Sequence, residues 1–176
     1  YLADTCWSAF TNIKDNDWDY YLDYRKSQGF NTLQINILPQ WDASATDLCY
    51  EPFEVIDGKY NYKKLNLSYF EHADKMCARA KEKGFELALV IMWCNFVPDT
   101  WASQFYSKGI MPIDCIDNYI NIIHETFTKY EPLYIISGDT DFNTEQCIEY
   151  YVKCAKQIKK LAPNCLYTTH IKGRYT

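Results

Sequence analysis

The chain has 176 residues, of which 48% are hydrophobic and 23% are charged, values typical of one globular domain with enough length for a core. Its net charge is -5 and its lysines and arginines are scattered along the chain, which argues against a nucleic-acid partner. No apolar run approaches the length of a membrane span, so we expect no membrane partner either.

Strand-like and helix-like patterns take turns along the first half of the chain. Residues 2–3 predict the tail of a strand, and 15–28 predict a helix that ends at Gly29. Residues 31–38 alternate between apolar and polar side chains and predict a second strand. The connection that follows, 43–67, shows no hairpin signal and is expected to be a long functional loop over the strand edge.

The second half of the chain continues the same alternation. Residues 85–93 are the most apolar run and predict a strand, while 133–136 are a short apolar run that ends at Ser137-Gly138. The expected elements are a helix at 69–83, a strand at 85–93, a helix at 113–130, a strand at 133–136, a helix at 144–161 and a strand at 166–169.

Five strands that alternate with helices predict a parallel sheet with helices outside it. A doubly wound sheet and an eight-stranded barrel both fit this order. Two observations favour the barrel: no glycine-rich phosphate turn follows the first strand, and polar or aromatic residues stand at every strand exit. A complete barrel needs roughly 250 residues. We therefore expect 1–176 to be the N-terminal part of a single (β/α)8 TIM-barrel catalytic domain, supplying roughly strands 1–5 and helices 1–4.

Eight cysteines are present, but neither a C-x-x-C pair nor a Cys/His spacing typical of zinc sites occurs among them. Cys77, Cys147 and Cys154 fall on apolar helix faces, where a free thiol packs as a small hydrophobic side chain. We therefore expect reduced structural cysteines, no metal and no other cofactor. A reducing compartment such as the bacterial cytoplasm is favoured. The chain opens inside an expected strand, as a fragment would, so export stays open.

A buried strand, a turn with two carboxylates and a helix follow one another around Asp139. Asp139 and Asp141 come directly after Ser137-Gly138, and a helical pattern opens at Thr144. Parallel α/β proteins place their chemistry at this edge of the sheet. An aspartate there can also cap a helix or brace a turn, but Asp141 and Thr144 are better placed for that role. Asp139 is therefore the first candidate for a catalytic group.

The other strand exits carry side chains that suit a carbohydrate partner, because polar groups can bind sugar hydroxyls and aromatic faces can stack on sugar rings. We predict substrate binding by Asp4, Trp7, Asn36, Gln40, Trp41, Trp93, Asn95 and His170. Phe96 and Trp101 are further aromatic residues in expected loops. Two alternatives stay open. Asp4 could be a hydrogen-bonded core carboxylate, or Asp4, Asp139 and His170 could together hold a metal ion.

Five segments of the chain, taken in order, point to one protein family. They are LADTCW (2–7), YLDYRKSQGFN (21–31), YFEHAD (69–74), LVIMW (89–93) and SGDTD (137–141). Together they resemble the apiosidase-like family of glycoside hydrolases, and they span nearly the whole chain. The resemblance implies a (β/α)8 barrel related to the cellulase-type retaining hydrolases.

In those relatives the acid/base carboxylate stands at the end of strand four and the nucleophile near the end of strand seven. The resemblance thus implies that Asp139 is the acid/base group and that the nucleophile lies outside this chain, although Gly138-Asp139 stands where cellulases have Asn-Glu. It implies hydrolysis of O-glycosidic bonds in oligo- or polysaccharides, with plant cell-wall glycans favoured, by two carboxylates. The alternatives are a non-catalytic glycan-binding barrel and a metal-dependent barrel enzyme such as a sugar isomerase.

Overall fold

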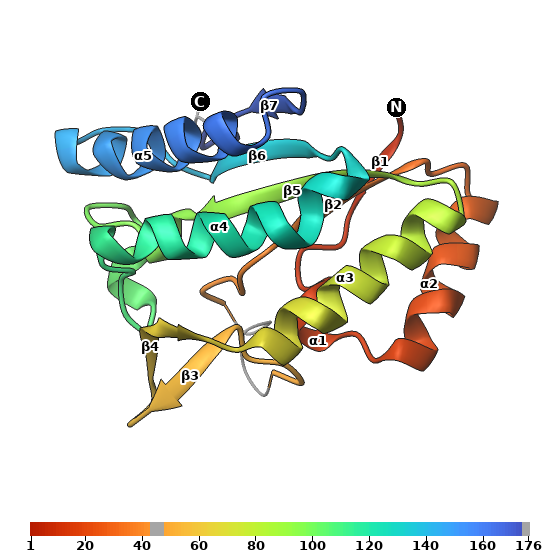
Figure 1. The fold of residues 1–176 in the computed structure, drawn as a ribbon, viewed down its shortest axis with the longest axis horizontal. Coiled ribbons are helices and arrows are strands. Elements are labelled where there is room, and N and C mark those ends of the chain that lie inside the picture. Colours follow the sequence, from red (N-terminus) through yellow and green to blue (C-terminus); the bar gives the residue numbers. More distant parts are fainter. Residues whose placement is uncertain (43–47, 174–176) are drawn as a thin grey trace.

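The computed structural model describes residues 1–42 and 48–173, and its centre is a five-stranded sheet (Figure 1). All neighbouring strands of this sheet run parallel. The strand order follows the chain: β1 (Ala3–Thr5), β2 (Thr32–Asn36), β5 (Glu86–Trp93), β6 (Leu133–Gly138) and β7 (Leu166–Thr168). The predicted parallel sheet of sequential strands is therefore confirmed.

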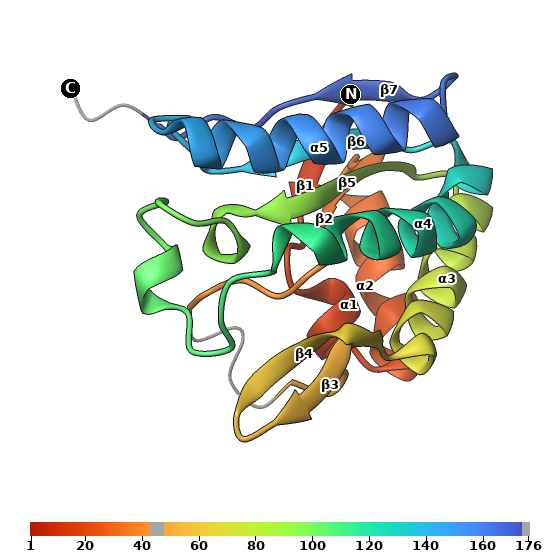
Figure 2. The same ribbon diagram turned by 60° about the vertical axis from the view of Figure 1, so that its left-hand side comes forward.

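A helix stands between each pair of consecutive strands of this sheet. The connecting helices are α2 (Asp15–Ser27), α3 (Leu67–Glu82), α4 (Ile116–Phe127) and α5 (Glu145–Leu161), and the one-turn helix α1 (Ala9–Asn12) precedes α2. Figures 1 and 2 show α4 beside α5 and α3 beside α4, so that consecutive helices pack against one another. The predicted helix at 113–130 is α4 flanked by two 3-10 turns, Ile113–Cys115 and Thr128–Tyr130.

Two hydrophobic clusters lie on the two faces of the sheet. The larger one joins strand and helix side chains, among them Leu22, Leu33, Met76, Leu89 and Ile123. The buried members of the smaller one are Ala88, Val90, Trp93, Cys94, Ala102 and Ile135, none of which comes from an α-helix of the described part. Helices therefore cover one face only, as in the wall of a barrel, whereas a doubly wound sheet carries helices on both faces.

A β-hairpin lies between β2 and α3, where the sequence analysis predicts a long loop without a hairpin. Its strands, β3 (Phe53–Ile56) and β4 (Lys59–Leu65), pair antiparallel around Asp57-Gly58. These two residues have positive φ angles of 49° and 76°, as tight hairpin turns require. The prediction of an irregular loop is therefore wrong for 53–65. Residues 43–47 of the predicted loop lie outside the described residues.

Cysteines belong mainly to the interior, whereas charged side chains spread over the surface. All eight cysteines are free thiols, and the predicted burial of Cys77, Cys147 and Cys154 is confirmed.

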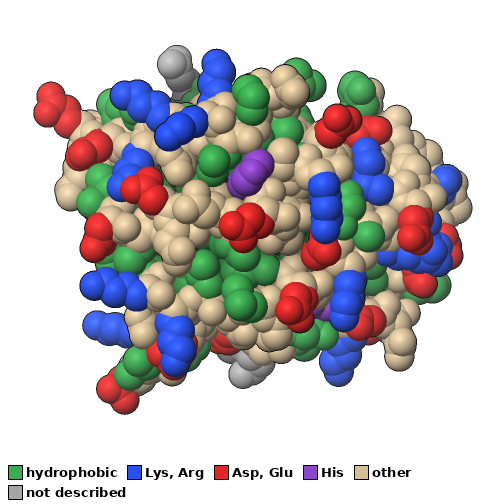
Figure 3. Space-filling view, in the orientation of Figure 1, with side chains coloured by type: hydrophobic (Ala, Val, Ile, Leu, Met, Phe, Trp, Pro, Cys, Tyr) green, Lys and Arg blue, Asp and Glu red, His purple; other side chains and the backbone are tan. Residues whose placement is uncertain are grey.

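Figure 3 shows basic and acidic side chains interspersed on the face that carries α4 and α5. Within the described ranges, no helix is both long and apolar enough to cross a membrane.

Candidate active site

The carboxyl-terminal ends of four strands meet around the indole ring of Trp93, the last residue of β5. The centroid of this ring lies 5.2 Å from that of Trp7, after β1, and 5.4 Å from that of His170, after β7. Gly138, at the end of β6, is the register partner of Trp93. Three of the predicted binding residues, from three different strand exits, therefore form one cluster at this edge of the sheet.

The Trp93 ring fills the space beside the Cα atom of Gly138. A Cβ atom added at Gly138 would lie 2.1 Å from Cε3 of Trp93, which is far inside van der Waals contact. The ring can therefore pack against the end of β6 only because this position has no side chain. Asp139 is the next residue along the chain, so this contact lies directly beside it.

Asp139 leaves β6 in a left-handed backbone conformation, with a φ of 50°. Its carbonyl oxygen accepts a hydrogen bond from Nε1 of Trp101 at 2.9 Å. The side chain is half-buried, and its carboxylate makes no hydrogen bond or ion pair with any residue that the structure describes. Burial, with the Asp139 charge as the next cause, raises the pKa of the Cys94 thiol to about 12, so this thiol stays neutral. Strained backbone of this kind is concentrated at functional sites.

The structural roles in the loop after β6 fall to the neighbours of Asp139. Thr144 caps α5, because its hydroxyl accepts a hydrogen bond from the Cys147 N–H at 3.1 Å. The same hydroxyl donates to Oδ2 of Asp99 at 3.1 Å. Asp141 forms an ion pair with Lys172 at 3.5 Å. The capping prediction for Thr144 is thus confirmed, and the Asp139 carboxylate is left without a structural task in the described part.

Several predicted binding residues carry buried polar atoms without a hydrogen-bond partner among the described residues. These atoms are Oδ1 and Nδ2 of Asn36, Nε2 of Gln40, Nε1 of Trp93, Oδ1 of Asn95 and Nδ1 of His170. Asn36, Gln40 and Asn95 are almost fully buried. Because an unsatisfied buried polar group costs roughly 1–3 kcal/mol, such groups call for partners, and the hydroxyls of a bound ligand can supply them.

Asp4 does not join this cluster. It lies inside β1, not after it, and it is the register partner of Leu33, whose side chain belongs to the helix-facing core. Its carboxylate forms an ion pair with Nε of Arg25 at 2.6 Å and accepts a hydrogen bond from the Tyr21 hydroxyl, both on α2. The predicted exit position of Asp4 is therefore wrong, and its alternative as a hydrogen-bonded structural carboxylate fits the contacts.

The metal-site alternative finds no support in these positions. Asp4 turns toward α2, whereas Asp139 and His170 follow β6 and β7. Across the described residues, no group of three or more His, Cys, Asp or Glu side chains could hold a metal ion.

The predicted loop aromatics divide into core and site residues. Phe96 is fully buried and packs edge-to-face against Tyr62 and Tyr106, so it belongs to the core. Trp41 and Trp101 are half-buried, and their rings meet edge-to-face with centroids 5.1 Å apart. The sequence analysis does not assign Trp101 to the site. The sequence feature that could have indicated its place in the site is its position: Trp101 lies in the loop after β5, the strand next to β6, from which Asp139 follows.

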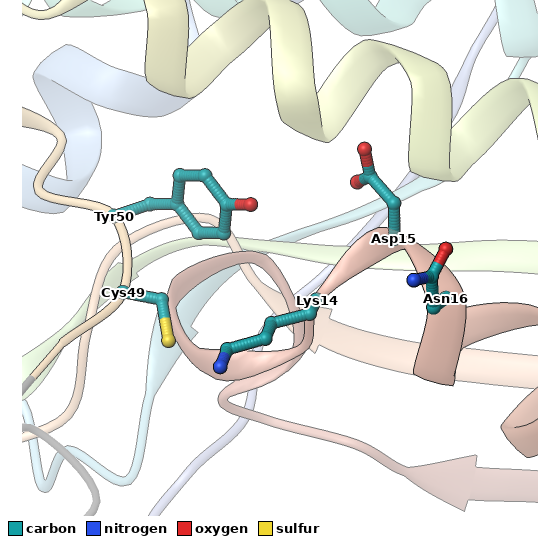
Figure 4. Close-up of a pocket in the computed structure, with 5 residues that line it drawn as sticks. All are labelled: Lys14, Asp15, Asn16, Cys49 and Tyr50. Atoms are coloured by element: carbon teal, nitrogen blue, oxygen red, sulfur yellow. The ribbon is translucent and has the colours of Figure 1, made fainter.

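Two open pockets lie near the strand exits. One, with a volume of about 360 Å³, is lined by Trp7, Gln40 and Asp42 among others, and so adjoins the exits of β1 and β2. The other, of about 520 Å³, lies at the start of α2 and is lined by Lys14, Asp15, Asn16, Cys49 and Tyr50 (Figure 4). Because this second pocket contains none of the predicted site residues, we assign the site to the strand exits.

Comparison with known proteins agrees with this architecture. A search of curated protein sequences gave no match. Among solved structures, the chain is similar to a glycoside hydrolase family 5 protein from Bacteroides vulgatus ATCC 8482, with a TM-score of 0.76, 22% identity and coverage of 99% of this chain and 36% of that chain. A second structure, titled "Glycoside hydrolase", gives a TM-score of 0.76 at 24% identity, with coverage of 99% and 37%.

A third similar structure is the endo-1,4-beta-D-mannanase from Thermotoga petrophila RKU-1, with a TM-score of 0.59, 18% identity and coverage of 99% of this chain and 56% of that chain. The chain thus spans little more than a third of the first two structures. The likeness shows the fold: the five parallel strands and their helices are part of a (β/α)8 TIM barrel, and this prediction is confirmed. A family model described as "Apiosidase-like, catalytic domain" matches residues 1–176. The chain therefore belongs to the apiosidase-like family.

Proposed function

We propose that the chain supplies the acid/base half of a glycosidase active site, with Asp139 as the acid/base group. One observation carries this proposal: the Asp139 carboxylate follows the fourth parallel strand and makes no hydrogen bond or ion pair with the described residues. Barrel enzymes build their active sites at this end of the strands. Membership of the apiosidase-like family supports the same class of reaction.

In the proposed mechanism, Asp139 protonates the leaving glycosidic oxygen and then, as a carboxylate, accepts a proton from the attacking water. A second carboxylate, from outside this chain, attacks the anomeric carbon as the protonated leaving sugar departs, and the water then cleaves the glycosyl ester so formed. Such a retaining enzyme holds the two carboxyl groups about 5–5.5 Å apart, whereas an inverting enzyme separates them by about 6.5–9.5 Å. The anomer of the first-formed product, read by NMR, distinguishes the two mechanisms.

The substrate class follows from the groups around Asp139. The buried amides of Asn36, Gln40 and Asn95 and the imidazole of His170 have atoms without a partner in the described part of the chain, and sugar hydroxyls can satisfy them. The rings of Trp7 and Trp93 offer faces for stacking. We therefore propose an oligo- or polysaccharide substrate, with plant cell-wall glycans as the favoured source because the resemblance to cellulase-type hydrolases implies them.

The proposal is tested by the release of sugars from plant polysaccharides and aryl glycosides by the complete protein that carries this chain. We expect Asp139→Asn to lower the rate on natural linkages by about 10²- to 10⁴-fold, the usual contribution of a general acid. Dinitrophenyl glycosides, whose leaving group needs no proton, should lose much less in the first step. Asp141→Asn is the matched control, because Asp141 lies two residues away and pairs with Lys172.

Equal rates for the complete protein and its Asp139→Asn variant would remove Asp139 from the chemistry. A second function, glycan binding without turnover, is favoured by the same unpaired amides and aromatic faces, since none of them needs Asp139. In that case the complete protein binds oligosaccharides and releases no product, and Asp139→Asn leaves the dissociation constant unchanged.

A further inference from the structure

Trp41, Trp101 and Phe105 form a chain of ring contacts that begins at Asp139. Trp101 donates its indole N–H to the Asp139 carbonyl oxygen at 2.9 Å. The centroids of the Trp41 and Trp101 rings lie 5.1 Å apart, and the two ring planes are inclined at 81°. The centroids of the Phe105 and Trp41 rings lie 6.1 Å apart, and the two ring planes are inclined at 43°. The three rings therefore lead from the candidate acid/base residue to the surface.

We propose that these three rings, here called the aromatic platform, bind a second sugar unit of the substrate, next to the unit whose bond is cleaved at Asp139. This inference rests on the proposed glycosidase function and deepens it, because it makes the site specific for substrates of two or more sugars. It also gives Trp101 the part of a positioning residue for Asp139.

The exposure of Phe105 is the first argument. Its side chain is 61% exposed, although Phe96 in the same loop is fully buried. Of these two phenylalanines, Phe96 thus belongs to the core, whereas the Phe105 ring is open to a ligand. Because the Phe105 ring also touches Trp41, it extends the apolar surface beside the site and does not stand alone.

The second argument is that hydrogen bonds order the base of the loop that carries Phe105. The hydroxyl of Thr100 donates to the carbonyl oxygens of Cys94 and Val97, at 2.6 and 3.0 Å. Ala102 is fully buried, and its carbonyl oxygen accepts the Phe105 N–H at 3.1 Å. A 3-10 turn, Ser103–Phe105, carries the exposed ring. In Figure 2 this loop reaches beyond the carboxyl end of β5, so the platform stands where a substrate must approach. A ring held on an ordered base loses little entropy when it binds.

The nature of the neighbouring side chains is the third argument. Ser103 and Gln104 directly precede Phe105, and the Gln104 amide donates to the Trp101 carbonyl oxygen at 3.2 Å. Apolar faces with hydroxyl and amide groups at their rim match a sugar ring, which has C–H faces and a hydroxyl edge. A docked protein would need a far larger apolar area than three rings provide.

The link between Trp101 and Asp139 adds a consequence for catalysis. Asp139 has a φ of 50°, in the left-handed region that few non-glycine residues adopt, although aspartate tolerates it better than most. The Trp101 N–H is one restraint on the Asp139 peptide. Trp101→Phe keeps a ring in the platform and removes this donor. It should therefore lower kcat more than it raises KM.

The test compares two substrates of the complete protein, an aryl monoglycoside and an oligosaccharide with the same cleaved unit. We expect Phe105→Ala to lower kcat/KM about tenfold further for the oligosaccharide than for the aryl monoglycoside, as the loss of one stacked ring implies. Phe105→Tyr should restore most of the loss. Tyr20→Ala is the matched control, because Tyr20 is an aromatic residue on α2 that is 75% exposed. It should show no difference between the substrates.

Equal losses on both substrates for Phe105→Ala would overturn the aromatic platform, as would a difference of the same size for Tyr20→Ala. Failure of the proposed function is read separately, from binding of the oligosaccharide to the catalytically disabled Asp139→Asn protein by calorimetry. Adding Phe105→Ala in that background should raise the dissociation constant about tenfold. An unchanged dissociation constant would refute the platform even if no substrate is cleaved.

Discussion

At the scale of single residues, Gly138 and Trp93 pack together directly before Asp139, the candidate acid/base residue. They are register partners on β6 and β5, and the indole ring lies where a Cβ atom of residue 138 would be. The cellulase-type Asn-Glu pair would not fit beneath this ring without movement of the ring. The Gly-Asp pair of this chain and the position of Trp93 are therefore two parts of one arrangement.

Replacement of Gly138 by alanine tests this arrangement. The added Cβ would meet three atoms of the Trp93 ring at 2.1 to 2.8 Å, so the ring or the strand must shift. We expect Gly138→Ala to lower the free energy of unfolding of the complete protein by about 1–3 kcal/mol, the usual cost of overpacking. Urea denaturation measures the change. Gly173→Ala is the control, since nothing lies within 4 Å of its added Cβ, and a similar loss there would contradict the explanation.

The positions of the candidate site residues could be predicted from the sequence only as well as the strand ends could. Asn36, Gln40, Trp93, Asn95 and His170 lie at the ends of strands as expected, and each has a buried polar atom without a hydrogen-bond partner among the described residues. Asp4 was misplaced because the first strand continues to Thr5. Since side chains alternate between the faces of a strand, a shift of the strand end by one or two residues decides which face a side chain meets. Both partners of the Asp4 carboxylate, Arg25 and Tyr21, come from a different element, α2.

At the scale of elements, the β3–β4 hairpin depends on the conformation of two residues. Asp57 and Gly58 both have positive φ angles, and nothing lies within 4 Å of a Cβ added at Gly58. Gly58→Ala should therefore lower stability by about 1 kcal/mol through backbone strain alone. The thermal midpoint of the complete protein measures this. Asp57→Asn is the control, because asparagine tolerates this conformation, and equal shifts for both variants would contradict the turn assignment.

A buried histidine on α3 makes a pH dependence of stability testable. Nδ1 of His72 lies 3.0 Å from Oδ1 of Asp15, and its ring stacks on Tyr50 with centroids 3.8 Å apart. Burial lowers the pKa of His72 below its usual value of 6.5, outweighing the opposite effect of Asp15. The unfolded chain thus binds a proton that the folded chain resists, so stability should fall as the pH drops below about 6.5.

Urea midpoints of the complete protein at pH 7.5 and 5.5 measure this dependence. We expect His72→Gln to reduce the difference between the two midpoints, because the titrating group is gone. His124→Gln on α4 controls for the loss of a helical histidine. If acidification to pH 5.5 stabilised the protein through His72, the Asp15 ion pair would outweigh burial and the stated sign would be wrong.

At the scale of the whole molecule, the order of the strands and helices was easier to predict than the face of the sheet that the helices cover. Strict alternation of strands and helices determines a parallel sheet, because parallel neighbours need crossover helices. It does not show which face the helices cover. The structure answers this through Ala88, Val90 and Ile135, whose cluster contains no α-helical side chain of the described part. The sequence signal for this one-sided cover was the collection of polar and aromatic residues at every strand exit.

The two edge strands of the sheet carry the last prediction. Among the described strands, β1 and β7 each pair with one neighbour only, and Leu166 on β7 and Ile171 after it are 72% and 64% exposed. Unpaired edges with apolar side chains are templates for association. We expect residues 1–176, produced alone, to self-associate and to lack hydrolytic turnover, because the second carboxylate of the proposed mechanism is not in this chain.

Sedimentation velocity over a range of concentrations measures the association of this isolated chain. Leu166→Lys combined with Ile171→Lys should shift it toward the monomer, since a charge on an edge opposes pairing with another chain. The double variant Tyr20→Lys and Tyr24→Lys, on the outer face of α2, controls for added charge at exposed aromatic positions. Association that both double variants reduce equally would assign the effect to net charge. Association that the control leaves intact places it at the β7 edge, where a barrel would continue.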